Sequence, residues 1–230
     1  MAPDEPVVVL PPRPRFVGRG GEKLDAALER FHIHVQGRRA FDLGASTGGF
    51  TDCLLQRGAA SVVALDVGYG QLHGRLRQDG RVEVHERTNV RDVTPGDLGA
   101  AADLVVADLS FISLRAVLPA ALALASDDAD VVLLVKPQFE ARRAEAARGR
   151  GVIADPAVWR RVLGEVAAAL GALGAAIMGA MASPLTGADG NVEFLLHALP
   201  GAGPRPPGAV AALLDAAVGE ALETAKAPGS

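Results

Sequence analysis

The chain has 230 residues with 49% hydrophobic and 4% aromatic side chains, a formal net charge of −4 and a pI near 5.7. That length and hydrophobicity fit one folded domain with a buried sheet, whereas the acidic balance counts against a long nucleic-acid footprint unless basic residues cluster. A single cysteine, Cys53, excludes an internal disulfide, and no positively charged segment followed by an apolar stretch opens the chain, so we expect a cytoplasmic protein.

The chain begins with a proline-rich segment, 1–17, whose composition predicts a tail or linker, and a single domain is expected over 18–230. A helix should begin near Gly21, because apolar residues recur there at helical spacing. Short apolar strands then alternate with helices, which predicts a parallel sheet with helices on both faces. The expected strands are 39–43, 61–66, 82–86, 103–107, 130–135, 175–182 and 192–198, and the expected helices are 50–57, 70–77, 113–125, 156–171 and 210–225.

The last two strands are separated only by 183–191, a turn-rich loop too short for a crossover helix, so they should form an antiparallel hairpin. The fold class is therefore α/β, with a Rossmann-like sheet of seven strands that is mostly parallel and ends in this hairpin. The longest apolar run, 166–182, is interrupted by glycines and predicts a helix followed by a buried strand, not a membrane span.

A glycine-rich turn follows the first strand, in the stretch AFDLGASTGGFTD from Ala40 to Asp52. It lacks the lysine of a phosphate-binding P-loop, and it does not match the dinucleotide fingerprint GxGxxG. The second strand ends in Asp66, where an acid can hold ribose hydroxyls. Asp42, the loop and Asp66 together favour S-adenosylmethionine as the cofactor, and their spacing alone leaves a dinucleotide open.

Charged residues stand at the ends of several predicted strands. Asp108 ends one strand, Lys136 ends another, and Glu193 lies early in the last strand, whose antiparallel start should meet the same rim. Lys23 lies in the first turn of the leading helix. A surface salt bridge is the plainer interpretation for each residue alone, but several such residues at one rim favour a common site.

Five segments, in order along the chain, resemble the TlyA (hemolysin A-like) family: Arg19–Leu24 (RGGEKL), Asp42–Thr51 (DLGASTGGFT), Asp108–Ser113 (DLSFIS), Val135–Glu140 (VKPQFE) and Gly187–Phe194 (GADGNVEF). The resemblance runs from about residue 16 to 199. It implies an S-adenosylmethionine-dependent ribosomal RNA 2′-O-methyltransferase with an FtsJ-like catalytic domain.

The resemblance also implies roles for individual residues. The catalytic residues of the family fall on a tetrad, which here means Lys23, Asp108, Lys136 and Glu193. Its cofactor residues fall on the loop, the second strand's end and two later positions: Asp42, Gly44, Ala45, Ser46, Thr47, Gly48, Gly49, Phe50, Asp66, Asn89, Val90 and Asp108. A ribose hydroxyl is a poor nucleophile and needs a positioned base, for which Lys136 is the candidate.

Basic residues cluster at two places despite the acidic total. Arg19 lies in the first cluster, and Arg142 and Arg143 lie in the second. The second cluster belongs to the charged segment 137–153, which is expected to be a loop that binds phosphates. Phe139 is a candidate for stacking on a base, with burial as the equal alternative. The histidines show no ligand spacing, so no metal site is expected.

The chain also departs from the family pattern. Members usually carry a small N-terminal RNA-binding domain, whereas only the proline-rich segment precedes Arg19 here, and Gly18 and Glu22 replace the usual serine and an apolar residue. Three hypotheses follow. The first is methylation of ribosomal RNA, the second is O- or N-methylation of a small molecule such as a nucleoside or natural product, and the third is a non-catalytic or hemolysin-type protein.

Overall fold

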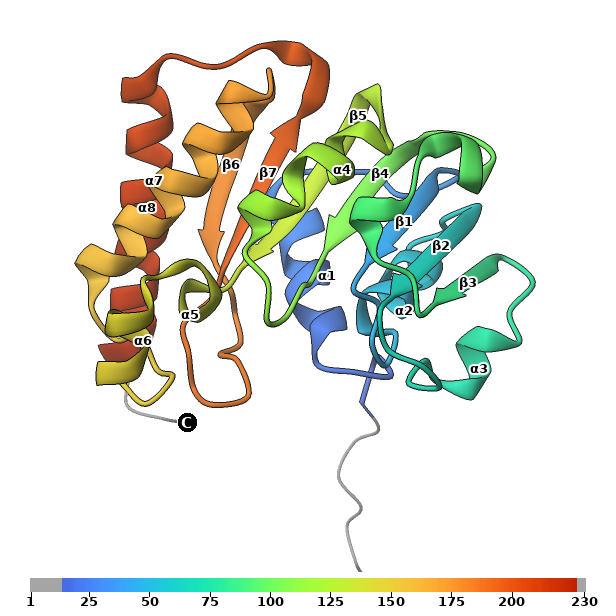
Figure 1. Cartoon of the computed structure of the whole chain (residues 1–230), viewed down its shortest axis with the longest axis horizontal. Coiled ribbons are helices and arrows are strands. Elements are labelled where there is room, and N and C mark those ends of the chain that lie inside the picture. The colour runs from blue at the N-terminus through green and yellow to red at the C-terminus, as the bar shows by residue number, and fades with distance from the viewer. Residues whose placement is uncertain (1–13, 227–230) are drawn as a thin grey trace, which may run out of the picture.

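The computed structural model describes residues 14–226 (Figure 1). Most of the proline-rich segment predicted at 1–17 therefore lies outside the described residues. Within its last part, Phe16 is buried in one of the two apolar clusters of the core, and the Val17 amide donates to the Asp52 carboxylate at 2.8 Å. The chain is thus packed onto the domain at least from Phe16 onward.

The sheet has seven strands in the order β3-β2-β1-β4-β5-β7-β6, in which only β7 runs against its neighbours (Figure 1). This confirms the predicted mostly parallel sheet with an antiparallel C-terminal end. The order reverses between β1 and β4, which is where ligands bind in open α/β sheets, beyond the carboxyl ends of the strands. The strands are β1 Arg39–Leu43, β2 Ser61–Asp66, β3 Val82–Glu86, β4 Ala102–Ala107, β5 Ala125–Val135, β6 Ala176–Ala182 and β7 Phe194–Leu199.

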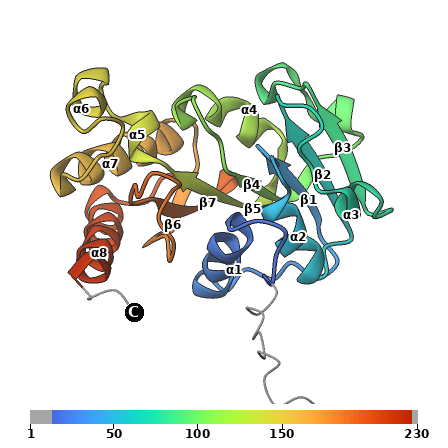
Figure 2. The same ribbon diagram turned by 90° about the horizontal axis from the view of Figure 1, so that it is seen from below.

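Helices cover both faces of the sheet, as predicted (Figure 2). One face packs against α1 and α2, and the other packs against α4 and α7, while α8 lies along the edge strand β6. Because both faces are covered, the central strands are apolar on both sides, which is the pattern that predicted them. The helices are α1 Gly20–Arg30, α2 Gly49–Gln56, α3 Gly74–Arg77, α4 Leu118–Ala123, α5 Pro137–Glu140, α6 Arg143–Arg148, α7 Pro156–Ala172 and α8 Pro207–Lys226.

Several predicted elements differ in extent from the structure. The helix predicted at 70–77 is only the short α3, and the helix predicted at 113–125 is a 3₁₀ turn, Leu114–Ala116, followed by α4. Strand β5 begins at Ala125, because its polar first half continues the sheet beyond the apolar stretch that marked the strand. The segment 137–153, expected to be a loop, contains α5 and α6.

Candidate active site

Strand register brings three of the tetrad residues together. Asp108 directly follows β4, and Lys136 directly follows the neighbouring β5. In the antiparallel pair of β5 and β7, Val135 lies opposite Phe194, so continuing the register by one residue sets Lys136 opposite Glu193. The three side chains therefore start from adjacent positions on one rim of the sheet, as the sequence predicted.

The tetrad residues form two ion pairs with different exposure. Lys23, on α1, pairs with Glu193, and the two side chains are only 8% and 3% exposed. Lys136 Nζ lies 2.5 Å from Asp108 Oδ1, and these two side chains are 11% and 24% exposed. Lys136 Nζ also donates to Ser110 Oγ at 3.0 Å. The Lys23–Glu193 pair is almost completely buried, so the more exposed Lys136–Asp108 pair is the better candidate for contact with a substrate.

The glycine loop between β1 and α2 depends on the absence of side chains at two positions. Gly44 has φ +88°, and a Cβ there would lie 2.5 Å from the backbone oxygen of Asp108. Gly48 has φ +98°, and its Cβ would lie 2.2 Å from a methyl group of Leu76. Only glycine adopts these conformations at low cost and allows such close approach. The loop is thereby held directly against the tetrad residue Asp108.

Asp66 fixes the other side of this loop. Its two carboxylate oxygens accept the backbone amides of Ser46, at 2.7 Å, and Gly68, at 2.6 Å. A carboxylate offers about four acceptor sites, so two such bonds leave acceptor capacity for a ligand. Asp66 therefore has a structural role that sequence reasoning missed, in addition to the ligand-binding role predicted for it.

A cavity of about 580 Å³ lies beside the loop, at the point where the strand order reverses. Its walls include five of the residues predicted to hold the cofactor, in addition to Asp108: Gly44, Ser46, Asp66, Asn89 and Val90. A smaller hollow of about 100 Å³ adjoins it at the start of α1, and its walls include Ala45, Thr47, Gly49 and Phe50. Asp108 lines both spaces, so it stands between them.

Some cavity residues were missed by the sequence reasoning. Phe111 and Ile112 line the cavity, and both follow the strand-end residue Asp108 within the DLSFIS segment. That position was an available signal, because residues just beyond a parallel strand lie at the binding rim. Thr88 and Val117 line it too, and nothing in their sequence context distinguishes them.

Asp42 lies beneath the loop and does not reach the cavity surface. It is fully buried, and Thr51 Oγ1 donates to its Oδ2 at 2.6 Å. Its Oδ1 has no hydrogen-bond partner among the described residues. Burial raises the pKa of Asp42 to about 7, and the nearby carboxylates of Asp108 and Asp66 act in the same direction, while the hydrogen bonds from Thr51 oppose the rise.

This raised pKa predicts a pH-dependent stability. An aspartate with a folded-state pKa of about 7 and an ordinary value of 3.8 retains its proton in the native state while the unfolded chain releases it. Its stabilising contribution is fully present below the lower value and is lost as pH rises through the higher one, a change of up to about 4 kcal/mol. Asp42→Asn removes this titration, so we expect the variant to gain stability relative to wild type between about pH 4 and about pH 8. Urea unfolding at both pH values measures the change, with the exposed Asp127→Asn as the control. An identical pH dependence in Asp42→Asn and wild type would contradict it.

The predicted substrate residues lie at the same rim. Arg19 is exposed at the start of α1, and Arg142 and Arg143 are exposed at the start of α6. Phe139 is half-buried, and its ring centroid lies 5.3 Å from that of Phe111, which is 92% exposed. Seven arginines at this rim form no ion pair with any residue that the structure describes: Arg19, Arg87, Arg91, Arg142, Arg143, Arg148 and Arg150.

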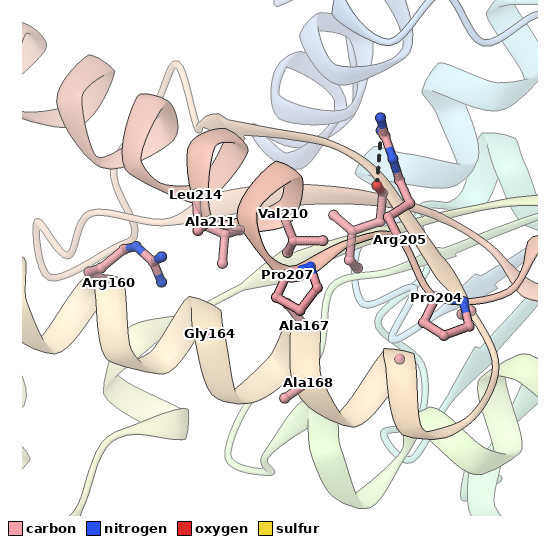
Figure 3. Close-up of a pocket in the computed structure, with 13 residues that line it drawn as sticks. Arg160, Gly164, Ala167, Ala168, Pro204, Arg205, Pro207, Val210, Ala211 and Leu214 are labelled. Atoms are coloured by element: carbon pink, nitrogen blue, oxygen red, sulfur yellow. Dashed lines mark hydrogen bonds between the residues drawn. The ribbon is translucent and has the colours of Figure 1, made fainter.

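A second cavity, of about 300 Å³, lies between α7 and α8 (Figure 3). Small residues of α7, such as Gly164 and Ala168, face Val210 and Leu214 of α8 across it. Arg160 and Arg205 are the only charged residues in its lining, and none of the predicted site residues is among them. The cavity beside the glycine loop is therefore the better candidate for a reaction site.

Residues 14–226 contain no group of three or more histidine, cysteine, aspartate or glutamate residues that could hold a metal ion. No helix within this range is long and apolar enough to cross a membrane.

The doubly wound sheet, the glycine loop after β1 and the acid at the end of β2 together define a cofactor-binding α/β fold, for which the sequence favoured the methyltransferase class. Sequence comparison agrees, since the profile of the FtsJ-like methyltransferase family matches residues 16–199. The chain belongs to this family and is a methyltransferase.

Individual relatives support the same assignment. Over 181 residues the chain is 57% identical to the 16S/23S rRNA (cytidine-2′-O)-methyltransferase TlyA of Mycobacterium tuberculosis, covering 79% of this chain and 67% of the relative. It is 47% identical to YqxC of Bacillus subtilis, described as an rRNA methyltransferase, covering 84% of this chain and 69% of the relative. A solved structure described as a hemolysin from Streptococcus thermophilus superposes with a TM-score of 0.85 at 39% identity, covering 93% of this chain and 78% of that one. The resemblance found in the sequence is confirmed.

Proposed function

We propose that the protein transfers a methyl group from S-adenosylmethionine to a ribose 2′-hydroxyl of ribosomal RNA. The observation that carries the proposal is the Lys136–Asp108 pair, which is partly buried and whose Asp108 lines the cavity beside the glycine loop. The relatives from Mycobacterium tuberculosis and Bacillus subtilis are described as rRNA methyltransferases, which supports the choice of acceptor.

The cavity fits the proposed cofactor in size and chemistry. A volume of about 580 Å³ is in the range of sites that enclose small molecules. The bare glycine backbone leaves room for a ligand beside the loop, and the free acceptor sites of Asp66 suit ribose hydroxyls. Asn89 and Val90 line the same cavity, in a position to contact a base. When bound, S-adenosylmethionine supplies an electrophilic methyl group on a sulfonium.

The chain's own residues supply the proton acceptor. A ribose hydroxyl gains nucleophilicity as it loses its proton, and a positioned base can remove that proton during attack. Lys136 Nζ contacts Asp108 and Ser110, which both line the cavity. In its unprotonated form this amine would accept the hydroxyl proton during attack, and Asp108 and Ser110 would hold it in place. The buried Lys23–Glu193 pair lies on the neighbouring strand position, because the register of β5 and β7 sets Glu193 opposite Lys136.

The surface around the cavity suits an RNA better than a free small molecule. Arginines without a described acidic partner lie after β3, as Arg87 and Arg91, and after β5, as Arg142 and Arg143. Cations on both sides of a site can contact consecutive phosphates of a backbone. Phe111 exposes its ring almost fully at the cavity wall, which suits stacking on an unpaired base. An enclosed, weakly charged acceptor pocket, as a small molecule would need, is not what the described rim presents.

The proposal is tested by incubating the purified protein with methyl-labelled S-adenosylmethionine and either ribosomal subunits or a metabolite extract. We expect label in ribosomal RNA, at a position that becomes resistant to alkaline cleavage because its 2′-oxygen is methylated. Label found only in small molecules would overturn the choice of acceptor. Label on a base, leaving the backbone sensitive to alkali, would overturn the choice of oxygen.

The arginine cluster on α6 gives a separate prediction. The double variant Arg142→Gln/Arg143→Gln should weaken RNA binding and flatten its salt dependence by about two units of log-log slope, because two phosphate contacts are lost. Cofactor affinity should not change. Filter binding over a series of salt concentrations measures the slope. Arg205→Gln, which removes an arginine at the wall of the α7–α8 cavity, is the control. An unchanged slope in the double variant would remove these arginines from the RNA contact.

A further inference from the structure

Glu140 is a buried carboxylate that the transfer reaction does not use. It is the last residue of α5 and is 4% exposed. Its oxygens accept hydrogen bonds from the Ser113 hydroxyl and the Leu114 amide, and Arg115 Nε lies 3.3 Å away. Arg115 also donates to the Glu140 backbone oxygen at 3.2 Å. The Glu140 carboxylate thus binds three consecutive residues, Ser113, Leu114 and Arg115.

That segment, Asp108–Arg115, runs beside Lys136–Glu140 and is tied to it at both ends. At the first end, Lys136 contacts Asp108 and Ser110. In the middle, the rings of Phe111 and Phe139 lie against each other at 5.3 Å. At the second end, Glu140 contacts Ser113, Leu114 and Arg115, and these four residues form the Glu140 cluster. The ties at the two ends enclose the residues that line the cavity mouth.

The backbone conformation of Phe111 has to be held by contacts of its neighbouring residues. Its φ is +63°, a left-handed backbone conformation that residues with a Cβ seldom adopt. Its ring is 92% exposed, so burial does not hold it in place. Strained residues persist only where their surroundings over-determine them. The residues that follow Phe111 are fixed on Glu140, and the residues before it are fixed on Lys136.

We propose that Glu140 is a positioning residue, whose carboxylate holds the 110–115 segment so that Ser110 and Phe111 stand ordered beside Lys136 at the cavity mouth. Its consequence for methyl transfer rests on the proposed function, whereas the ordering itself is a property of the protein alone. Glu140 acts through Ser113, Leu114 and Arg115, and it does not touch the reacting atoms.

The test compares Glu140→Gln with Glu165→Gln. Glutamine keeps the size of Glu140 and leaves one oxygen for the Leu114 amide, but it loses the charge that faces Arg115 and turns an amide donor toward the cluster. Glu165 is the other acidic partner of Arg115, at 3.0 Å, and is partly exposed on α7. Its variant removes an ion pair of the same arginine, together with the Glu165–Arg161 pair, and leaves the Glu140 carboxylate unchanged. Ser113→Ala is the milder second variant, which removes one hydrogen bond of Glu140.

Two readouts separate positioning from general stability. We expect amide hydrogen exchange in residues 110–115 of the free protein to become about tenfold faster in Glu140→Gln, less in Ser113→Ala, and to stay unchanged in Glu165→Gln. We also expect kcat/KM for RNA to fall about 100-fold in Glu140→Gln, with cofactor affinity and melting temperature close to wild type.

The outcomes are distinguishable from failure of the proposed function. If wild type methylates no ribosomal RNA, the proposed function fails, and the exchange experiment still decides the positioning role. Unchanged exchange in both Glu140→Gln and Ser113→Ala would overturn the inference. So would a uniform rise in exchange over the whole chain, because that would indicate loss of stability in place of local ordering.

Discussion

Replacing Lys136 with alanine is expected to lower kcat for methyl transfer by about three orders of magnitude, the size of effect that a lost general base produces. The cofactor dissociation constant should change little, because the Lys136 side chain reaches Asp108 and Ser110 and not the glycine loop or Asp66. Single-turnover transfer of labelled methyl groups measures the chemical step, and calorimetry measures cofactor binding.

Lys136→Arg is the matched control for charge. Arginine keeps a cation beside Asp108, but its guanidinium does not release a proton in proteins and so cannot act as a base. We therefore expect Lys136→Arg to be nearly as inactive as Lys136→Ala. Full turnover by Lys136→Ala would remove Lys136 from the reaction. Substantial activity in Lys136→Arg alone would indicate that the residue serves as a positive charge and not as a proton acceptor.

The rim of the sheet was predictable from sequence because two simple rules act together. Apolar strands of a parallel sheet end at one edge, so Asp108 and Lys136 had to lie on the same edge once their strands were recognised. The short loop before the last strand then required that strand to run antiparallel, which put Glu193 at the same edge. The partner of Glu193 does not follow from these rules, because Lys23 arrives on a helix that packs across the face of the sheet.

Other features were beyond sequence reasoning for physical reasons. The first half of β5 is polar and pairs with β4 only at Ala125, before a register irregularity that lasts to Asp130, so no apolar pattern marked it. The role of Asp66 in holding the loop depends on amides of Ser46 and Gly68 that only the folded backbone presents. The exposure of Phe111 is equally a tertiary property, since an aromatic residue in an apolar segment is usually buried.

The contact of the glycine loop with Asp108 predicts that Gly44→Ala will have a large effect on both stability and cofactor binding. The new methyl group would lie 2.5 Å from the Asp108 backbone oxygen, in a residue already held at φ +88°. The Asp108 amide is itself bonded to the Leu43 oxygen at 3.0 Å, so neither segment can move aside without breaking the rim. We expect about 3 kcal/mol less free energy of unfolding and at least a 100-fold loss of cofactor affinity.

Gly37→Ala separates the two causes of this loss. Gly37 also has a left-handed backbone, with φ +78°, but a Cβ there meets nothing within 4 Å. Its substitution should therefore lower the free energy of unfolding only by the cost of the left-handed backbone conformation, about 1 kcal/mol, and should leave cofactor binding unchanged. Urea unfolding and calorimetric titration of both variants with S-adenosylmethionine give the comparison. Equal losses of stability in the two variants would mean that the clash with Asp108 is relieved cheaply. In that case the close packing of loop against tetrad would not be what shapes the cofactor cavity.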